Sequence, residues 1–539
     1  MNYLPSMLYS DGIKKHTDEA FYGYNHTETP RSGEIYDMMN LTSDSYPLVS
    51  VRRPRKNRRS ITAARGLCSF DGLYWVAKEN ASDDWYSLFQ EGISSAAPVE
   101  GLQLDGRDKK MAVLGAYLVI FPDKKYYNRL TGAYGNLGSE WTGGCAFSDS
   151  TITDLSGSGF SNVFRPGDAV TLTGLLTHPE NNKTVIIRAV SGMILVFDDN
   201  TFTVGSADPA SENVTISRSV PDLDFIFENE NRLWGCKGDT IFASKLGDPF
   251  NWNVFDGLST DSYAATVGSA GDFTGATSYM GYPMFFKESG IYKIYGDKPG
   301  NFQIVASSSV GVARGCERSL CVSGDVLFYV SNNGVMAYTG GAPRCISACF
   351  GQRRLDDARA GSDGIKYYLS LRDYSTVAGY ELFVYDTHSG LWHREDDFKI
   401  AFAALDGAGE LCAVKTDVNN NSFEMWTLGT VKAGNPTEAN IASFCEFGDW
   451  TGTAVNRKGV SKIQLRLYVA PGAHVTVKIM YDSDSHWHTV KTLASSGKDS
   501  YYLPVIPRRC DHLRLRIEGI GDWRLYSLTR ECYIGSELL

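Results

Sequence analysis

Short runs of aromatic and β-branched residues recur along the chain, and each run passes through a turn into a second run. In residues 326–338, for example, V-L-F-Y-V-S leads through N-N-G into V-M-A-Y. Turns of this kind (N-N-G, H-S-G, E-S-G) place a glycine where a tight hairpin needs a positive φ. Further paired runs lie at 71–76, 117–127, 232–244, 283–295, 381–393 and 411–426. Their spacing of roughly 40–55 residues is that of one four-stranded blade, so the pattern predicts a β-propeller of about six to eight blades.

The series is interrupted between residues 137 and 220, where Ser, Thr and Gly become frequent. Residues 164–174, 182–190 and 193–197 are read as alternating strands of their own, separated by compact turns. We expect a small β-barrel or β-sandwich inserted between two blades, because an exposed loop tolerates an insertion whose ends stay close together.

Apolar and polar positions alternate strictly in the last hundred residues. Ile463, Leu465, Leu467 and Val469 point to one side of a predicted strand, and the alternation returns at 475–479 and 513–517. Half-buried strands of this kind pack as a β-sandwich. The predicted fold is therefore all-β, in four parts: an extended N-terminal arm at 1–60, a propeller at 61–136 plus 221–433, the inserted β-domain at 137–220 and a C-terminal β-sandwich at 434–539.

The predicted arm ends in a basic run that contains no acidic residue. Pro47 and Pro54 oppose a helix here, which favours extended backbone. One interpretation is a solvated arm, and the other is contact with nucleic acid or with an acidic neighbouring subunit. The candidate contact residues are Arg52, Arg53, Arg55, Lys56, Arg58 and Arg59.

Composition narrows the class of protein. Among 539 residues, 62 acidic and 52 basic side chains give a formal charge of −10, which argues against a protein that coats nucleic acid but not against a repulsive wall along which DNA slides. The 11 cysteines have scattered spacing and no C-x-x-C, as in reduced thiols of a protein assembled in a cytoplasm. We expect no secretory signal in the first twelve residues and no membrane span, since a span needs about 20 apolar residues.

The search for chemistry leaves only weak candidates. The chain contains no P-loop, no G-x-S-x-G elbow, no H-E-x-x-H pair and no EF-hand loop. His486 and His488, near Asp482 and Asp484, could hold a metal, although D-S-D-S is also an ordinary hairpin turn. We expect no catalytic residue, no cofactor and no metal, and hence no enzyme. Weaker alternatives are a glycosidase carboxylate pair and a sugar-binding aromatic, for which the candidates are 395–397, Glu228, Glu230 and Trp252.

Two segments carry a family resemblance. Residues 225–252 combine an N-R-L-W-G hairpin with a G-D-P-F-N-W turn, and residues 281–296 read G-Y-P-M-F-F-K-E-S-G-I-Y-K-I-Y-G. These residues resemble the blades of phage tail hub proteins, in particular the tail nozzle, or packaged-DNA stabilisation, proteins of short-tailed phages. Residues 33–55 look like the opening of phage structural proteins. The resemblance is strong over roughly 220–345, about a quarter of the chain.

The resemblance implies a structural virion protein, located in the phage tail after assembly in the host cytoplasm. It implies a homohexameric ring at the end of the tail tube that retains packaged DNA and provides the channel for its ejection, without sequence-specific binding. Tail tube or adaptor proteins and tail fibres are the implied partners. No catalytic residue comes with this family. A distal tail or fibre-attachment protein that binds a receptor is the alternative, and a propeller glycosidase is a third.

Overall fold

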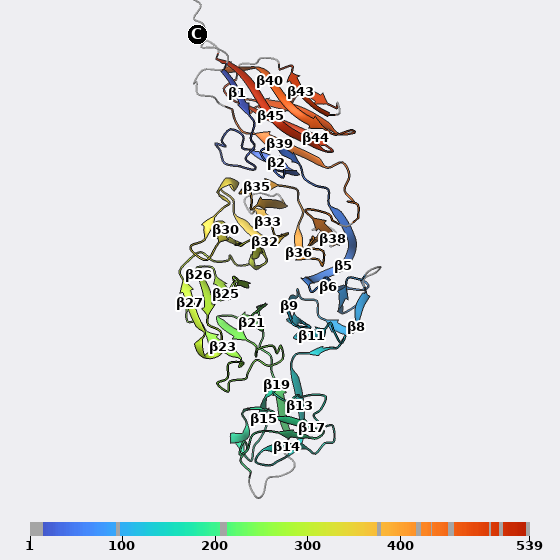
Figure 1. Ribbon diagram of the computed structural model, residues 1–539, viewed down its shortest axis with the longest axis vertical. Coiled ribbons are helices and arrows are strands. Elements are labelled where there is room, and N and C mark those ends of the chain that lie inside the picture. Colours follow the sequence, from blue (N-terminus) through green and yellow to red (C-terminus); the bar gives the residue numbers. More distant parts are fainter. Residues whose placement is uncertain are drawn as a thin grey trace, which may run out of the picture. The chain divides into compact units, whose positions relative to one another are not determined.

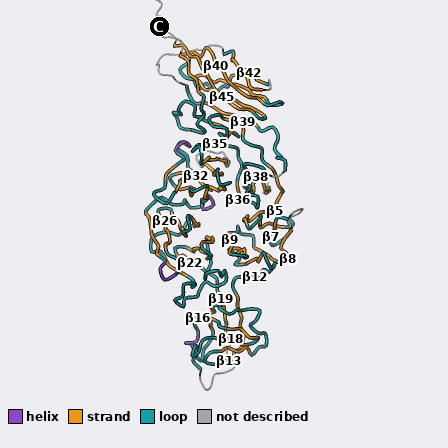
Figure 2. Tube along the Cα trace, viewed as in Figure 1, coloured by secondary structure: helices purple, strands orange, loops and turns teal. Residues whose placement is uncertain are grey.

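A computed structural model describes residues 14–92, 97–204, 213–373, 379–416, 422–432, 434–450, 458–494, 497–505 and 510–534. Figure 2 shows that these residues form strands and connecting loops, with only short 3-10 turns such as η1 (Pro179–Asn181) between them. Across the described ranges, no helix has the length and apolar character that crossing a membrane requires. The fold is all-β, as the sequence predicts.

The chain forms two units. The first comprises the residues up to Ile61 and from Arg318 onward, and the second comprises Thr62–Glu317. The chain passes from the first unit to the second within strand β5 (Lys56–Ser69). The first half of β5 pairs with β38 (Phe423–Leu428), and its second half pairs with β6 (Leu73–Lys78).

Four-stranded antiparallel sheets, the meanders of propeller blades, make up most of the second unit. Their middle strands are apolar and buried, whereas the outer strands are more exposed. The number of blades stays a prediction. The strands are β7 (Tyr86–Gln90) and β8 (Ala97–Leu104) beside β5 and β6; β9 (Lys110–Leu114), β10 (Tyr117–Phe121), β11 (Lys125–Asn128) and β12 (Tyr134–Asn136); β20 (Phe225–Asn229), β21 (Arg232–Lys237), β22 (Thr240–Ala243) and β23 (Tyr263–Thr266); and β24 (Gly275–Tyr279), β25 (Tyr282–Lys287), β26 (Gly290–Tyr295) and β27 (Gln303–Ser307).

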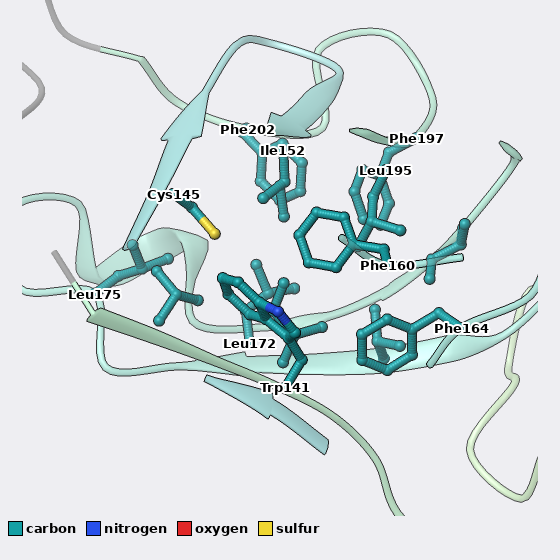
Figure 3. Packing of buried hydrophobic residues seen from close by; sticks show 14 residues of the cluster. Trp141, Cys145, Ile152, Phe160, Phe164, Leu172, Leu175, Leu195, Phe197 and Phe202 are labelled. Atoms are coloured by element: carbon teal, nitrogen blue, oxygen red, sulfur yellow. The ribbon is translucent and has the colours of Figure 1, made fainter. Parts of the chain in front are cut away.

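The inserted domain has its own sheet and its own core. Strand β13 (Ser139–Phe147) pairs with β19 (Asn213–Arg218) over its first part and with β14 (Thr151–Asp154) over its last part, so one strand joins two halves of the sheet. The core between them is aromatic: the rings of Trp141 and Phe160 meet edge to face at 4.9 Å (Figure 3). The remaining strands are β15 (Ala169–Thr173), β16 (Thr184–Ile186), β17 (Ala189–Ser191) and β18 (Ile194–Val196).

Blade sheets also form the middle of the first unit. The last of these sheets is completed by residues 56–61 of β5, which pair antiparallel with β38. The strands are β28 (Cys321–Ser323), β29 (Val326–Ser331), β30 (Gly334–Tyr338) and β31 (Arg344–Cys345); β32 (Leu355–Ser362), β33 (Lys366–Asp373), β34 (Tyr380–Asp386) and β35 (Leu391–Arg394); and β36 (Ile400–Leu405) and β37 (Leu411–Thr416) beside β38.

The C-terminal β-sandwich confirms the predicted alternation, since Ile463, Leu465, Leu467 and Val469 are completely buried. One sheet contains β40 (Lys458–Val469), β43 (Gly497–Leu503) and β45 (Trp523–Ile534), and the other contains β39 (Ala442–Phe447), β41 (His474–Tyr481), β42 (His488–Leu493) and β44 (Leu513–Ile520).

The N-terminal segment differs from the predicted extended arm, whose residues 1–13 lie outside the described part of the chain. Figure 1 shows blue N-terminal strands among the red strands of the sandwich. Both sheets are completed in this way, because a strand gains hydrogen bonds only beside another strand's edge. The pairs are β1 (Lys14–Asp18) with β45, β2 (Asp37–Met39) with β39, and β3 (Leu41–Thr42) with β4 (Val49–Val51), which in turn pairs with β45.

Candidate functional site

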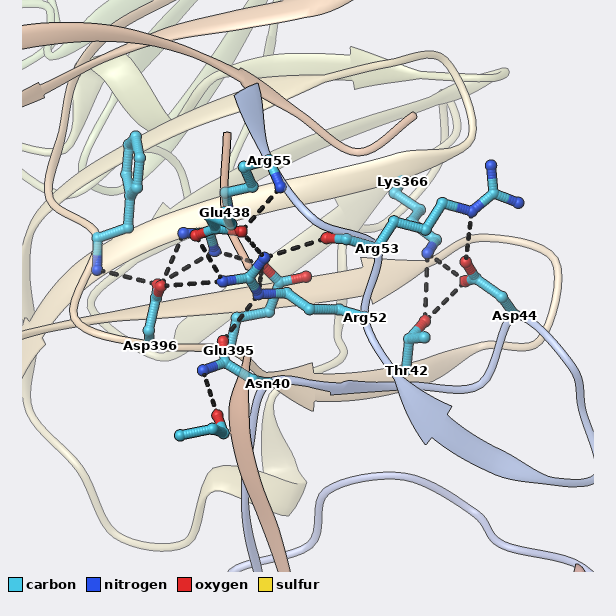
Figure 4. A network of polar contacts seen from close by, with 12 residues as sticks. Asn40, Thr42, Asp44, Arg52, Arg53, Arg55, Lys366, Glu395, Asp396 and Glu438 are labelled. Atoms are coloured by element: carbon cyan, nitrogen blue, oxygen red, sulfur yellow. Dashed lines mark hydrogen bonds and ion pairs between the residues drawn. The ribbon is translucent and has the colours of Figure 1, made fainter. Parts of the chain in front are cut away.

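The basic run of the N-terminal segment lies in a network of ion pairs inside the first unit (Figure 4). Pro54 interrupts strand pairing between β4 and β5, so residues 52–55 belong to no strand, and their backbone is held by local contacts such as Arg55 N–H to Glu438 at 2.7 Å. The side chains of Arg52 and Arg55 are only 6% and 3% exposed. Buried cations require ionised partners, and the chain supplies them from two distant segments, residues 395–396 and Glu438.

Arg52 and Arg55 each bind carboxylates through both guanidinium amino groups. Arg52 Nη1 and Nη2 donate to Glu438 at 2.6 and 3.0 Å. Arg55 Nη2 donates to Glu395 at 2.5 Å, and its Nη1 donates to Asp396 at 2.7 Å. Such forked contacts fix the geometry as well as the charge. The network therefore ties residues 52–55 to the end of β35 and to the segment that precedes the sandwich.

Arg53 lies at the edge of this network and is exposed. Its side chain is 59% exposed and lies 3.7 Å from Asp44, while its Nη1 donates to Thr430 at 3.0 Å. Asp44 also pairs with Lys366 of β33.

The other three predicted contact residues belong to strand β5 and are half-buried. Arg58 donates from Nε to the Thr427 hydroxyl at 2.8 Å and from Nη2 to Glu410 at 2.5 Å, and it also pairs with Asp406. Lys56 and Arg59 lie opposite Thr427 and Met425 in the β5–β38 ladder.

The predicted nucleic-acid or subunit contact is thus corrected for Arg52, Arg55 and Arg58. The acidic neighbour of these guanidinium groups is their own chain, so their charge is neutralised within the fold. The structure describes the side chains of all six residues, and among them Arg53 alone is exposed. The run was visible in the sequence, but its partners, at separations of up to 386 residues, were not.

A polar cavity of about 260 Å³ opens beside the network. Its walls carry cations and carboxylates in equal number, which leaves little net charge for a polyanion. Such a lining offers donors and acceptors side by side, which suits water or a small neutral polar molecule. The charged side chains that line it are Arg52, Arg53, Arg55, Lys366, Asp44, Asp363, Asp386 and Glu395, and the imidazole of His388 also reaches it.

The carboxylates of the network make stability depend on pH. Burial, the largest single influence, raises the pKa of Asp396, but the charge and hydrogen bonds of Arg55, together with Arg52 and the Phe398 backbone N–H, hold the pKa below its ordinary value. Burial likewise raises the pKa of Glu438, whereas the hydrogen bonds and charge of Arg52 lower it, and the net shift of this pKa is also downward. A carboxyl group whose pKa is lower in the folded than in the unfolded state stabilises the folded protein at pH values above its unfolded pKa. This stabilisation is lost as the pH falls through the folded pKa.

We expect the melting temperature to fall as the pH drops below about 4, the pKa of carboxyl groups in the unfolded chain. Thermal melts from about pH 7 to about pH 3 measure this dependence. The variant Arg55→Met removes the cation that lowers the pKa of Asp396, so its melting temperature should fall less steeply over the same range. Parallel curves for the two proteins would contradict the assignment.

The family-like motifs of the second unit join a blade to the inserted domain. Asn251, in the G-D-P-F-N-W turn, donates to Asp168 at 3.1 Å and accepts from the Ala169 backbone N–H at 3.0 Å. Asp168 also forms a buried ion pair with Arg218. Arg165 and Arg218 lie over the ring of Phe250, at 4.6 and 5.2 Å from its centroid. The turn therefore anchors the inserted domain through residues 165–169 and through Arg218 near the domain's C-terminal end.

The N-R-L-W-G residues hold the loop that follows β22. The buried Arg232 donates to the backbone carbonyls of Ser244, Ser259 and Asp261 at 2.9, 2.7 and 2.5 Å. Gly235 leaves no room for a side chain, because a Cβ would lie 2.6 Å from the Phe225 carbonyl oxygen. These residues are structural.

The remaining candidates from the sequence do not converge on one site. Trp252 is 1% exposed and donates to the Pro249 carbonyl, so its ring is part of the core. Glu228 is exposed and accepts from the Asn231 backbone N–H. His488 lies 3.4 Å from Asp484, and the described residues contain no group of three or more ligands that could hold a metal ion.

Two cysteines at the end of one blade sheet differ in accessibility. Cys345 is exposed, whereas burial raises the pKa of Cys349 to about 12. Since only the thiolate reacts with alkylating reagents, we expect iodoacetamide to modify Cys345 in the native protein and to leave Cys349 unmodified. Mass spectrometry of tryptic peptides measures both sites, with the urea-unfolded protein as the control. Equal labelling of the two thiols under native conditions would contradict this expectation.

Comparison with known proteins gives likeness of fold only. No family model and no curated protein matches the chain. Among solved structures, Hsv2 from Kluyveromyces lactis is similar with a TM-score of 0.26 and 13% identity, over 51% of this chain and 88% of that one. The exo-β-1,3-galactanase from Phanerochaete chrysosporium has a TM-score of 0.19 and 9% identity, over 89% and 98%. A GH43 glycoside hydrolase has a TM-score of 0.20 and 9% identity, over 58% and 96%.

These likenesses correct one expectation from the sequence. Glycoside hydrolases are among the solved structures that resemble the chain, so the expectation that it is not an enzyme is withdrawn. At these TM-scores the likeness carries no argument about substrate or residue roles.

Proposed function

We propose that the chain is a structural protein of a phage tail. It forms an oligomeric nozzle or hub that extends the tail tube, retains packaged DNA and provides the channel for its ejection. The observation that carries this proposal is the combination of the N-R-L-W-G hairpin with the G-D-P-F-N-W turn in residues 225–252, which resembles tail hub blades. The formal charge of −10 is compatible with a channel wall from which DNA is repelled.

The contacts of that motif support a mechanical role. Asn251, Asp168 and Arg218 fix the inserted domain to its blade through buried polar contacts. In the first unit, Arg55 and Arg52 fix the N-terminal segment in a comparable way. Buried ion pairs are costly to break by removing one partner. A protein that holds back pressurised DNA needs joints of this kind.

Electron microscopy of the purified chain, and of the particle from which it comes, tests the proposal. We expect a six-fold ring with an acidic bore at the tail tip. A monomer with a closed centre would overturn the nozzle. Glycan binding by such a monomer would favour the receptor-binding alternative, and hydrolysis of a glycan would favour a glycosidase. The variant Asp198→Asn, in an exposed ion pair of the inserted domain, serves as a control that should assemble like the unmodified chain.

A further inference from the structure

Two strands of the first unit, β32 and β36, each contain a β-bulge, and the two bulges are joined by a hydrogen bond. In β32 the register shifts between Asp356 and Arg359, and Asp357 has a φ of 44°, which non-glycine residues rarely adopt. In β36 the register shifts between Ile400 and Phe402, which makes Ala401 the extra residue. Bulges and left-handed residues concentrate at sites where a strand must aim a side chain.

The Ala401 carbonyl at this bulge holds two guanidinium groups together. Arg318 Nη1 and Arg359 Nη1 each donate to this oxygen at 3.2 Å. Arg318 also lies over the ring of Phe402, 4.5 Å from its centroid. Two guanidinium charges therefore meet at one neutral oxygen, and Asp357 is the carboxylate beside Arg359.

The bulge of β32 brings further cations to the same place. Arg359 Nε donates to Asp357 at 3.1 Å, and Lys399 Nζ lies 4.0 Å from the same carboxylate. Arg372 pairs with Asp356 at 3.0 Å. Around Asp357 itself, the two cations Arg359 and Lys399 face one carboxylate. Burial lowers the pKa of Lys399, the Asp357 carboxylate raises it, and the charges of Arg359 and Arg372 lower it further, so that the net shift of the pKa is downward.

Two charged donors at this place have unused hydrogens. Within the described residues, Arg359 Nη2 makes no hydrogen bond, and Lys399 Nζ has only the Asp357 carboxylate and the Tyr380 ring near it, each at 4.0 Å. The side chains of Arg359 and Lys399 are 23% and 17% exposed, so a solute can reach them.

We propose that Arg359 and Lys399, with Arg318 beside them, form a binding site for a phosphate-type oxyanion at the paired bulges of β32 and β36. The planar fork of Arg359 is already oriented by Ala401 and Asp357, so little side-chain entropy is lost when its remaining amino group binds an oxygen. The ammonium of Lys399, which approaches the other oxygen of the same Asp357 carboxylate, supplies a second donor. This site does not depend on the proposed tail function.

Isothermal titration calorimetry of the full chain with inorganic phosphate tests the site. We expect the variants Arg359→Gln and Lys399→Gln each to weaken phosphate binding about tenfold or more, because each removes one charged donor. Arg188→Gln is the control, since Arg188 is exposed and also paired with a carboxylate, Asp198. Lys399→Gln breaks no hydrogen bond, so it keeps the test decisive if Arg359→Gln fails to fold.

A short single-stranded DNA oligonucleotide distinguishes the source of the oxyanion. Binding of phosphate alone assigns the site to a free anion, and oligonucleotide binding that is lost in both variants assigns it to a phosphodiester. Either result supports the site. It is overturned if the unmodified chain binds neither probe, or if both variants bind as tightly as Arg188→Gln.

Discussion

Replacing Arg55 with methionine is expected to lower the free energy of unfolding by about 3–5 kcal/mol. Arg55 is 3% exposed and contacts Glu395 at 2.5 Å and Asp396 at 2.7 Å. Methionine fills much of the same volume but removes the cation that is hydrogen-bonded to both carboxylates, and it leaves them the more distant Arg52, at 3.6 Å from Glu395 and 3.5 Å from Asp396. Removing one partner of a buried ion pair is among the most destabilising changes. Urea-induced unfolding followed by tryptophan fluorescence measures the effect.

Arg53→Met is the matched control, two positions away in the same segment. Its side chain is 59% exposed, and its ion pair with Asp44 spans 3.7 Å. An exposed pair contributes about 0–1 kcal/mol, so the unfolding midpoint should hardly move. If the two variants lost the same stability, the buried network would not be what holds the N-terminal segment.

Replacing Asp168 with asparagine is expected to loosen the inserted domain, at a cost of about 3–5 kcal/mol. Asp168 and Arg218 are 3% and 5% exposed, and asparagine preserves the shape while removing the charge that Arg218 needs. Limited proteolysis should cleave residues 139–218 faster in the variant. Asp198→Asn is the control, because Asp198 and its partner Arg188 are 65% and 49% exposed. An unchanged cleavage rate for Asp168→Asn would show that the apolar contacts alone hold the domain.

The parts of the fold that depend on local pattern could be predicted from the sequence. Alternation of apolar and polar residues fixes which face of a strand is buried, so the strands of the sandwich could be predicted from it. Gly334 and Gly390 have φ values of 108° and 70°, as the N-N-G and H-S-G turns require. Gly290 of E-S-G does not have a positive φ, and the absence of its side chain instead makes room for the Tyr292 hydroxyl, 3.0 Å from where a Cβ would lie.

The N-terminal strands and the partners of the basic run could not be predicted, because both depend on contacts between distant residues. The K-K-H-T-D of β1 has no apolar alternation, and four of its five residues are exposed. Arg55 and Glu395 are 340 residues apart. A run of six cations is equally consistent with an external polyanion and with internal carboxylates, and only the fold decides between them. The paired bulges of β32 and β36 likewise leave no mark in the sequence.

The pairing of N-terminal strands with C-terminal ones sets the order in which the chain is completed during synthesis. Thr17 of β1 contacts Thr529 of β45 across 512 residues. At about 5–20 residues per second, the ribosome needs roughly 25–100 s to supply that partner. Until β45 has been made, β1 and β4 lack the strand with which they pair, and open edges are templates for wrong pairing. We infer that the blades and the inserted domain assemble while translation continues, and that the sandwich closes only after the last strand leaves the ribosome.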